Sequence, residues 1–329
     1  MAKYEVINGE GLIPNTEIKI KDGAFKNRKD LSHVIIPNTV EEIGEDAFFG
    51  CTGLTKIVIP VSVKRVRWGA FAYCTNLATM IVAKGNPYLD SRDNCNAIIE
   101  KEHKILVAGC KNTIIPNSVL EIRGEAFKGC SDLMEIIIPE SVKTIGWGAF
   151  RDCTGLTKIF IPKNVSKIEG ELFNKCTNLT SIVISEDNKD YDSRNNCNAV
   201  VDTYYNTLIS GCKTTTIPDS VKTIKYKALA DCKGLTSVEV PTSVIDIWPR
   251  AFENCCDLAD VVLSNSLEEI GYKAFSNCIK LSSIEIPFSV RKVDNYAFDN
   301  CTGLKIVVVN NPKTIIGTNA FPDNSYEKI

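Results

Sequence analysis

The chain carries cysteines at a fixed spacing of 23 residues. Nine cysteines keep this spacing in three runs, namely Cys51 and Cys74, then Cys130, Cys153 and Cys176, then Cys232, Cys255, Cys278 and Cys301. An Ala-Phe pair, such as Ala149-Phe150, keeps the same spacing along much of the chain. A fixed period between about 20 and 50 residues is typical of repeat architectures, so it outweighs the interpretation of any single segment.

One repeat shows what each copy can form. Leu156-x-x-Ile159-x-Ile161 has a period of two at its end, which predicts a short strand with both isoleucines on one face. Pro162 ends this strand, because proline has no N–H for a ladder hydrogen bond. Val165 and Ile168 then face inward on either side of a turn, and a bend follows. The few inward residues of one repeat cannot close a core, so the sequence predicts stacked rungs.

The whole pattern, Leu-x-x-Ile-x-Ile-Pro-x-Ser-Val-x-x-Ile-Gly-x-x-Ala-Phe-x-x-Cys, resembles the BspA-type (treponemal-type) leucine-rich repeat of bacterial surface proteins. The resemblance covers nearly the whole chain. It implies a β-rich, curved right-handed solenoid with a parallel sheet on its concave face and turns or short 3-10 segments elsewhere. It also implies adhesion to host or extracellular-matrix proteins, cell–cell contact, and a place on the cell surface or outside the cell.

The spacing recurs from one end of the chain to the other and predicts one solenoid domain over residues 1–329, although the length alone would allow two domains. Arg28 and Asn324 stand where ordinary rungs carry cysteine. A charged or polar residue is tolerable in that slot only where no further rung covers it. We therefore predict an N-terminal cap over about residues 1–34 and a C-terminal cap over about residues 310–329.

The period is interrupted twice, between Cys74 and Cys130 and between Cys176 and Cys232. The two inserts, at about residues 83–113 and 185–215, closely resemble each other. We predict a β-hairpin in each, with turns near Glu102-His103 and Tyr204-Tyr205. The pattern leaves open whether the inserts are modified rungs or side projections.

The charge and the start of the chain limit the class of protein. A formal net charge of −2 gives no support for nucleic-acid or general membrane binding, and no apolar run approaches the length of a transmembrane helix. The residues after Met1 contain no apolar stretch of a signal peptide, so the chain as written is expected in the cytoplasm. This expectation conflicts with the surface location that the resemblance implies, unless a leader was replaced or this is a cytoplasmic member.

The cysteines do not predict a metal or cofactor. None stands in a C-x-x-C pattern and the chain has only two histidines, so no zinc site is expected. We expect the repeated cysteines to be reduced, small buried hydrophobic residues. Cys153→Ser is expected to destabilise the protein by about 1–3 kcal/mol, because a hydroxyl there would need a buried partner. Cys95 and Cys110 fall opposite each other across the first predicted hairpin, as Cys197 and Cys212 do across the second, so disulfides there remain open.

The inserts also carry polar side chains that could suggest chemistry. Ser91 and His103 could act as nucleophile and base, but the matching insert has Ser193 and no histidine, so we predict no catalytic residue and no enzyme. The alternating oxygens from Glu186 to Asp192 could hold Ca²⁺. The first insert lacks that series, so a solvated acidic loop is favoured and no metal site is predicted.

The outward residue between the two inward residues of each strand is the best candidate for binding a partner. Contiguous exposed apolar patches usually mark interaction sites, although β-propensity alone would also favour such residues. We predict a non-enzymatic protein-binding module, adhesin-like or an interaction scaffold, that uses the concave face. The alternative is an intracellular structural scaffold that self-associates through the same face. The candidate residues are Ile35, Val58, Ile81, Ile137, Phe160, Val183, Glu239, Val262 and Glu285.

Overall fold

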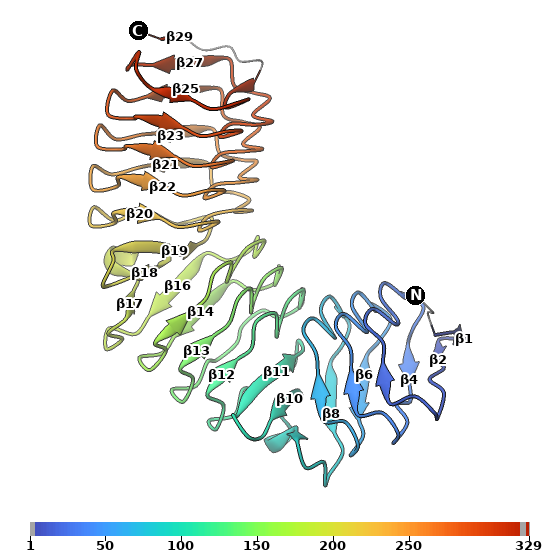
Figure 1. The fold of residues 1–329 in the computed structure, drawn as a ribbon. Coiled ribbons are helices and arrows are strands. Elements are labelled where there is room, and N and C mark those ends of the chain that lie inside the picture. Colours follow the sequence, from blue (N-terminus) through green and yellow to red (C-terminus); the bar gives the residue numbers. More distant parts are fainter. Residues whose placement is uncertain (1–3, 323–326, 329) are drawn as a thin grey trace. The chain divides into compact units, whose positions relative to one another are not determined.

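The computed structural model describes residues 4–322 and 327–328. The chain forms two compact units, Met1–Leu172 and Phe173–Ile329, and each is described here by itself. Both are stacks of rungs of about 23 residues with parallel ladders and very little helix (Figure 1). The predicted β-rich repeat solenoid is therefore confirmed. Among the described residues, no helix has the length and apolar character needed to cross a membrane.

The strands at the predicted Leu-x-x-Ile-x-Ile positions are called the long strands, including those in which only two residues pair. In the first unit they follow the predicted period of two. They are β4 (His33–Val34), β6 (Lys56–Ile59), β8 (Thr79–Val82) and β14 (Lys158–Ile161). β6 and β8 pair in parallel, with Val58 opposite Ile81. In β6, Ile57 and Ile59 are buried while Lys56 and Val58 are exposed, so alternate residues face the core and the solvent.

A second parallel ladder lies between the predicted turn and the predicted bend of each rung. In the first unit it contains β3 (Lys19–Ile20), β5 (Glu42–Ile43) and β7 (Arg65–Val66), and then β12 (Glu121–Ile122), β13 (Thr144–Ile145) and β15 (Lys167–Ile168). The prediction of turns alone was incomplete, because a strand of two residues is too short to show a period in the sequence. The second residue of each strand is buried, as Ile43 and Ile145 are.

The second unit repeats both ladders. Its long strands are β16 (Ser181–Ile184), β21 (Ser237–Glu239), β23 (Asp260–Val262), β25 (Ser283–Ile286), β27 (Ile306–Val309) and β29 (Glu327–Lys328). Its short strands are β20 (Thr223–Ile224), β22 (Asp246–Ile247), β24 (Glu269–Ile270), β26 (Lys292–Val293) and β28 (Ile315–Ile316). The short strands form one continuous ladder, whereas β21 pairs with β23 and β25 pairs with β27 in separate sheets.

Both predicted hairpins are confirmed, and they are modified rungs. The first insert contains β9 (Leu89–Asp90), η1 (Arg92–Asn94), β10 (Ala97–Glu100) and β11 (Ile105–Gly109). The second contains β17 (Tyr191–Asp192), η2 (Arg194–Asn196), β18 (Ala199–Asp202) and β19 (Thr207–Gly211). In each hairpin the second strand pairs in parallel with the next short strand, β11 with β12 and β19 with β20. The inserts thus continue the second ladder and do not project from it.

The first insert forms a shallower rung than its neighbours. The Gly109 N–H donates to the Ala126 carbonyl at 2.8 Å, as the Phe127 N–H donates to Ala149 at 2.9 Å, so Gly109 occupies the phenylalanine slot. A Cβ there would lie 2.2 Å from the Phe127 ring. The rung before the insert therefore meets the rung after it directly, because the Tyr73 N–H donates to the Lys128 carbonyl at 3.0 Å.

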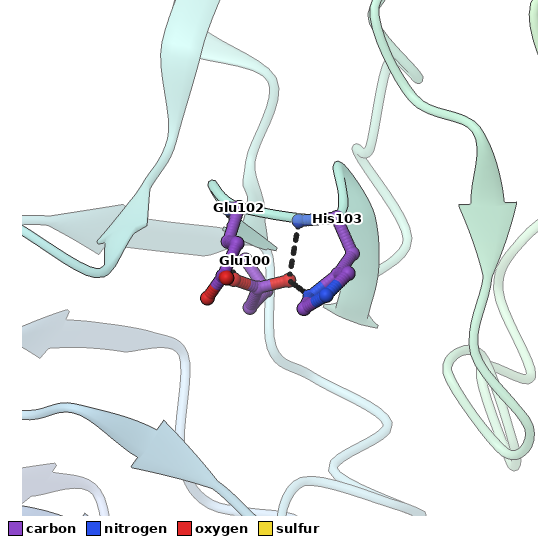
Figure 2. Close-up of side chains that lie close together, drawn as sticks. All are labelled: Glu100, Glu102 and His103. Carbon is purple, nitrogen blue, oxygen red and sulfur yellow. Dashed lines mark hydrogen bonds and ion pairs between the residues drawn. The ribbon is translucent and has the colours of Figure 1, made fainter.

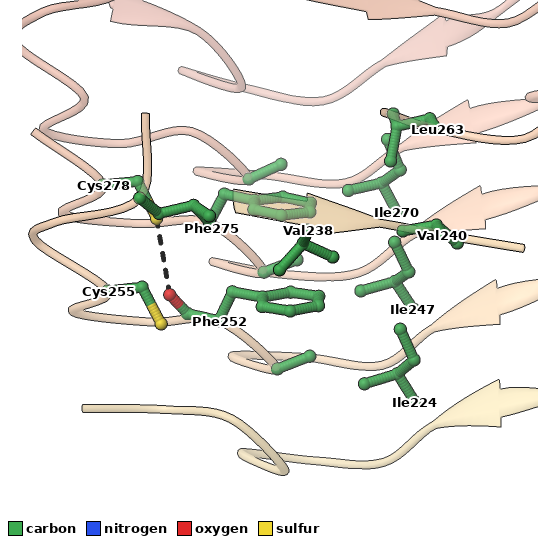
Figure 3. Packing of buried hydrophobic residues seen from close by; sticks show 14 of the residues in the cluster. Ile224, Val238, Val240, Ile247, Phe252, Cys255, Leu263, Ile270, Phe275 and Cys278 are labelled. Atoms are coloured by element: carbon green, nitrogen blue, oxygen red, sulfur yellow. Dashed lines mark hydrogen bonds between the residues drawn. The ribbon is translucent and has the colours of Figure 1, made fainter. Parts of the chain in front are cut away.

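Stacked phenylalanines form the centre of each unit. In the first unit the ring centroids of Phe25 and Phe48 are 5.2 Å apart, and in the second unit those of Phe252 and Phe275 are 4.8 Å apart with nearly parallel planes. Figure 3 shows the latter pair beside Ile224, Ile247 and Ile270 of the second ladder. Identical side chains in successive rungs thus contact one another, which is what the 23-residue period produces.

The fourteen cysteines all lie in the described part of the chain and are free thiols. Burial raises the pKa of the Cys51 thiol to about 12 and that of Cys95 to about 11, which keeps both protonated. The two pairs left open as disulfides are unpaired here. Cys95 Sγ donates to the Ala97 carbonyl at 3.7 Å and Cys110 Sγ to the Asn96 carbonyl at 3.3 Å.

The repeated cysteines do more than fill space. Cys51 Sγ donates to the Phe25 carbonyl at 3.0 Å, and Cys153 Sγ donates to the Phe127 carbonyl at 3.1 Å. In these rungs the thiol thus adds a hydrogen bond to a carbonyl of the preceding rung that also accepts a backbone N–H, as Figure 3 shows for Cys278 and Phe252. The Phe127 carbonyl is the buried group that a serine hydroxyl at Cys153 would need as its partner, and the predicted cost of Cys153→Ser stays a prediction.

The N-terminal rung is preceded by a further hairpin. β1 (Val6–Ile7) pairs antiparallel with β2 (Glu10–Gly11), and β2 pairs in parallel with β4. The Tyr4 ring lies 5.3 Å from the Phe25 ring and continues the aromatic stack. Arg28 forms an exposed ion pair with Asp30 at 2.7 Å. Both caps remain predictions, and Asn324 lies outside the described residues.

Candidate functional site

The outer face of the long strands carries all of the predicted partner-binding residues, and each of them is exposed. In the first unit these are Ile35, Val58, Ile81, Ile137 and Phe160, with exposed fractions from 38% at Ile81 to 83% at Ile137. Val58 is the strand partner of Ile81, and Ile137 forms a parallel bridge with Phe160. Neighbouring members of this set therefore lie on adjacent rungs.

Two further residues, Leu12 and Ile114, occupy the same slot and were not predicted from the sequence. Leu12 follows Gly11, which pairs with Val34, and it lines a hollow of about 300 Å³ together with Ile35. Ile114 precedes Ile115-Pro116 just as Ile35 precedes Ile36-Pro37, and the Pro116 carbonyl accepts the same type of turn hydrogen bond as that of Pro37. The dipeptide Ile-Pro at the end of the strand was the signal that could have identified both.

Seven outward side chains of the first unit are thus exposed and apolar. We call them the apolar row, and they are Leu12, Ile35, Val58, Ile81, Ile114, Ile137 and Phe160. Charges beside the row are few and mixed. Lys56 is exposed, and Lys158 forms an ion pair with Glu135 at 3.5 Å. The row can therefore contact an apolar surface without the burial of many charges.

The second unit has a different outer face. The same slot carries both apolar and polar side chains, which we call the mixed row, and its members are Val183, Thr216, Glu239, Val262, Glu285 and Val308. Glu239 is the strand partner of Val262, and Glu285 is the strand partner of Val308. Each of these carboxylates therefore lies beside a valine on the neighbouring rung.

A groove of about 600 Å³ lies over the first rungs of this face. Its lining comes from three successive rungs, with Thr216 and Asp219 from the first, Glu239 and Pro241 from the second, and Val262, Leu263 and Ser264 from the third. β21 pairs with β23 on one side, whereas within the described residues no ladder joins its other side to residues 215–217. The groove therefore follows a strand edge.

The side chains considered for catalysis have separate roles in turns. Ser91 Oγ accepts the Val82 N–H at 3.0 Å, and Ser193 Oγ accepts the Ile184 N–H at 3.1 Å in the second insert. His103 Nδ1 lies 3.2 Å from a Glu100 oxygen at the tip of the first hairpin. The structure thus gives Ser91 and His103 different partners, and the role of Ser91 recurs in an insert that has no histidine.

Glu100, Glu102 and His103 have ligand atoms within 4.8 Å of one another and could geometrically hold a metal ion (Figure 2). The Glu100 carboxylate already accepts the N–H groups of Glu102 at 2.8 Å and His103 at 3.0 Å. Asp202 accepts the corresponding N–H groups of the second hairpin, where tyrosines replace the other two ligands. The shared role of the carboxylate is therefore to close the hairpin turn.

Two of the four side chains considered for Ca²⁺, Asn188 and Asp192, make contacts that fold the second insert. Asn188 Oδ1 accepts the N–H groups of Asp190 at 3.0 Å and Tyr191 at 2.9 Å. Asp192 forms an ion pair with Arg194 at 2.7 Å. Asn86 and Asp90 make the same contacts in the first insert, which lacks the alternating acidic series.

The sequence profile described as BspA type leucine-rich repeat region, with six copies, matches residues 10–98, 107–199 and 198–327. A leucine-rich cell surface protein from Faecalibacterium prausnitzii is 27% identical, with a TM-score of 0.63 over 93% of this chain and 84% of that one. A leucine-rich repeat protein from Eubacterium ventriosum is 23% identical, with a TM-score of 0.51 over 86% and 80%. The comparison with curated proteins gives no match.

Proposed function

Because this chain belongs to the BspA-type leucine-rich repeat family, we propose that it is a protein-binding module, adhesin-like or an interaction scaffold, with no catalytic role. Repeat proteins of this family generally act as interaction modules, and the similar Faecalibacterium protein is described as a cell surface protein. We extend that location to this chain. The proposed partner is a protein, with host or extracellular-matrix proteins as the first class to examine.

The observation that carries this proposal is the apolar row. Seven exposed apolar side chains occupy one slot of the first unit, and exposed contiguous apolar surface usually marks an interaction site. Val58, Ile81 and Phe160 lie within strands and Ile137 is bridged to Phe160, so binding would require little ordering of the backbone there. Val183, Glu239, Val262 and Glu285 would extend the same function to the face of the second unit.

Binding of the intact protein to purified extracellular-matrix proteins, measured by surface plasmon resonance, tests this function. We expect Ile137→Glu with Phe160→Glu to weaken binding to the matrix protein at least tenfold. Ile18→Glu with Tyr88→Glu is the matched control, because both residues are exposed in the first unit and lie outside the row. Equal loss in both double variants, or no binding to any matrix protein, would contradict the proposal.

Self-association is the second candidate function, and the uniform apolar character of the row favours it. Two copies could bury their rows against each other and remove apolar surface from water. Sedimentation equilibrium should then give a mass that rises with concentration in the native protein and stays monomeric in the Ile137→Glu, Phe160→Glu variant. A constant monomer mass would exclude this second function.

A further inference from the structure

The groove over β21 and β23 has an unbalanced charge. Asp219 and Glu239 contribute carboxylates to its lining, and no lysine, arginine or histidine lines it. Within the described residues, neither carboxylate forms a hydrogen bond or an ion pair. Asp260 lies beside the groove, where it is the strand partner of Ser237. Like charges gathered without counter-ions favour a cationic ligand.

A buried hydroxyl in the same lining has no partner. Ser264 is 9% exposed, and its Oγ forms no hydrogen bond within the described structure. Ser264 stands where other rungs have proline, as at Pro241 one rung earlier. A buried polar atom without a partner costs free energy, so its place beside the groove suggests that a ligand completes its hydrogen bonding.

The spread of the carboxylates distinguishes between kinds of cation. Within the described residues, one group of three metal-ligating side chains lies within 4.8 Å, and it is at Glu100 and not in this groove. A compact divalent ion therefore finds no cage here. The charged head of an arginine or lysine side chain has several donors that can reach separated oxygens, and its methylene stem can lie on Val262 and Pro241.

We propose that this groove binds an arginine or lysine side chain presented by an extended segment of the partner protein. Asp219 and Glu239 accept hydrogen bonds from the cationic head, and the hydroxyls of Thr216 and Ser264 add neutral acceptors. The open edge of β21 lies along the groove, so the partner's backbone can run beside this strand. This inference rests on the proposed function and specifies one chemical feature of the partner.

The test measures binding of three capped hexapeptides to the intact protein by isothermal titration calorimetry. Their sequences are Ser-Val-Arg-Val-Arg-Ser and the two counterparts with glutamine or glutamate in place of arginine. We expect the arginine peptide to bind at least tenfold more tightly than the glutamine peptide, and the glutamate peptide not to bind. Because the attraction is electrostatic, raising the salt concentration should weaken binding of the arginine peptide.

Charge-neutral variants localise the site. Asp219→Asn with Glu239→Gln should reduce affinity for the arginine peptide to that of the glutamine peptide. Glu186→Gln with Asp187→Asn removes the same charge from an exposed loop of the second unit and should leave affinity within twofold. Ser264→Ala should weaken binding at least threefold without lowering the melting temperature, since no hydrogen bond of the free protein is lost.

Equal affinity for the arginine and glutamine peptides, or unchanged affinity in the Asp219→Asn, Glu239→Gln variant, would overturn the inference. Binding of the matrix protein in the previous experiment would still stand in that case, because it is measured through the apolar row. Conversely, tight binding of the arginine peptide together with no binding of any matrix protein would support the groove and contradict the class of partner proposed above.

Discussion

The two units carry the same strands but present different outer faces. In the first unit the outward slot holds apolar side chains from Leu12 to Phe160, whereas in the second unit it includes Thr216, Glu239 and Glu285. The inward slots change far less, since stacked phenylalanines and buried cysteines fill both units. Stacking constrains each inward residue through the rungs above and below it, while the outward residue is free to differ. Any difference between the two units in the partners they bind should therefore arise from the outer face and not from the interior.

The short-strand ladders differ between the units in their charges. In the first unit Glu42 lies between cations, at 3.1 Å from both Lys19 and Arg67. Hydrogen bonding from Arg67 is the main cause that lowers the pKa of the Glu42 carboxyl. In the second unit Asp246 is the strand partner of Glu269, and burial, followed by repulsion from Glu269, raises the pKa of the Asp246 carboxyl. The Glu42 carboxylate is therefore stabilised by its neighbours in the first ladder, whereas the Asp246 carboxylate is not stabilised by Glu269 in the second.

The largest expected effect tests whether the two interiors are equivalent. Phe150→Ala and Phe275→Ala each remove a fully buried ring from a stack. Each should lower the free energy of unfolding by about 3–5 kcal/mol, because burial is lost and a cavity remains. Chemical denaturation of the two variants measures this. A difference of more than about 2 kcal/mol between the losses of the two variants would show that the two interiors are not equivalent.

The next effect concerns the thiols. Cys153→Ala removes one of two donors of the Phe127 carbonyl, which still accepts the Cys130 N–H at 3.0 Å, so we expect a loss of about 0.5–1.5 kcal/mol. Cys153→Ser keeps a donor near that carbonyl and should cost less. The same order is expected at Cys255, whose Sγ donates to the Leu229 carbonyl at 3.1 Å in the second unit. If serine proves worse than alanine at both positions, the thiols act only as small hydrophobic groups.

Substitutions that remove a charge from the short-strand ladders should change the free energy of unfolding in opposite directions in the two units. Glu42→Gln should lower the free energy of unfolding at pH 7 by about 1 kcal/mol, because three cations lose their shared partner. Asp246→Asn should raise it by a smaller amount, because the repulsion from Glu269 is removed. Thermal melts at pH 7 measure both, and a decrease with Asp246→Asn would refute the like-charge explanation.

The carboxyl groups of Glu42 and Asp246 also predict how stability depends on pH. The pKa of Glu42 is lowered by folding, so its contribution is present above the unfolded pKa and is lost as the pH falls through the folded pKa. The pKa of Asp246 is raised, so its contribution is present at acidic pH and is lost as the pH rises through the folded pKa. Melts across this acidic range should therefore show Glu42→Gln approaching the native protein as the pH falls. The gain from Asp246→Asn should shrink over the same range.

Substitutions on the outer faces are expected to change stability least. Ile137→Glu and Val262→Glu should each change the free energy of unfolding by no more than about 0.5 kcal/mol, because both side chains are exposed. Circular dichroism melts of the two variants provide the measurement. A collapse of the melting transition in either variant would show that the outward residue contributes to packing in that unit.

Much of the fold could be predicted from the sequence because stacking repeats the same requirement every 23 residues. The inward Ile57 and Ile59, the aligned Phe48 and the hairpins all follow from period and turn signals. The second ladder could not be predicted, since strands such as Glu42–Ile43 are too short to show a period. The acceptor of each thiol was also hidden, because it is a backbone carbonyl of the preceding rung.

The candidate site was predictable only as a row of slots. The pattern identified Ile137 and Phe160, but Leu12 and Ile114 lie in the first rung and at the border of an insert, where the cysteine spacing gives no guide. The groove lies where, among the described residues, no ladder joins residues 215–217 to β21. Whether two neighbouring rungs pair depends on the distance between them, and the sequence carries no signal for that distance.

The shallow rung of the first insert also affects how the chain can assemble. The Arg123 guanidinium donates to the Val66 carbonyl at 3.0 and 2.9 Å across a separation of 57 residues, whereas ordinary neighbours such as Asp22 and Glu45 are 23 residues apart. Closing the longer loop costs about 0.8 kcal/mol more in chain entropy if the insert is still unfolded. Rungs on either side of the insert should therefore join late, after the hairpin has formed and shortened the intervening chain. If the first unit folds rung by rung, the step across this insert should therefore be slower than the steps between ordinary rungs.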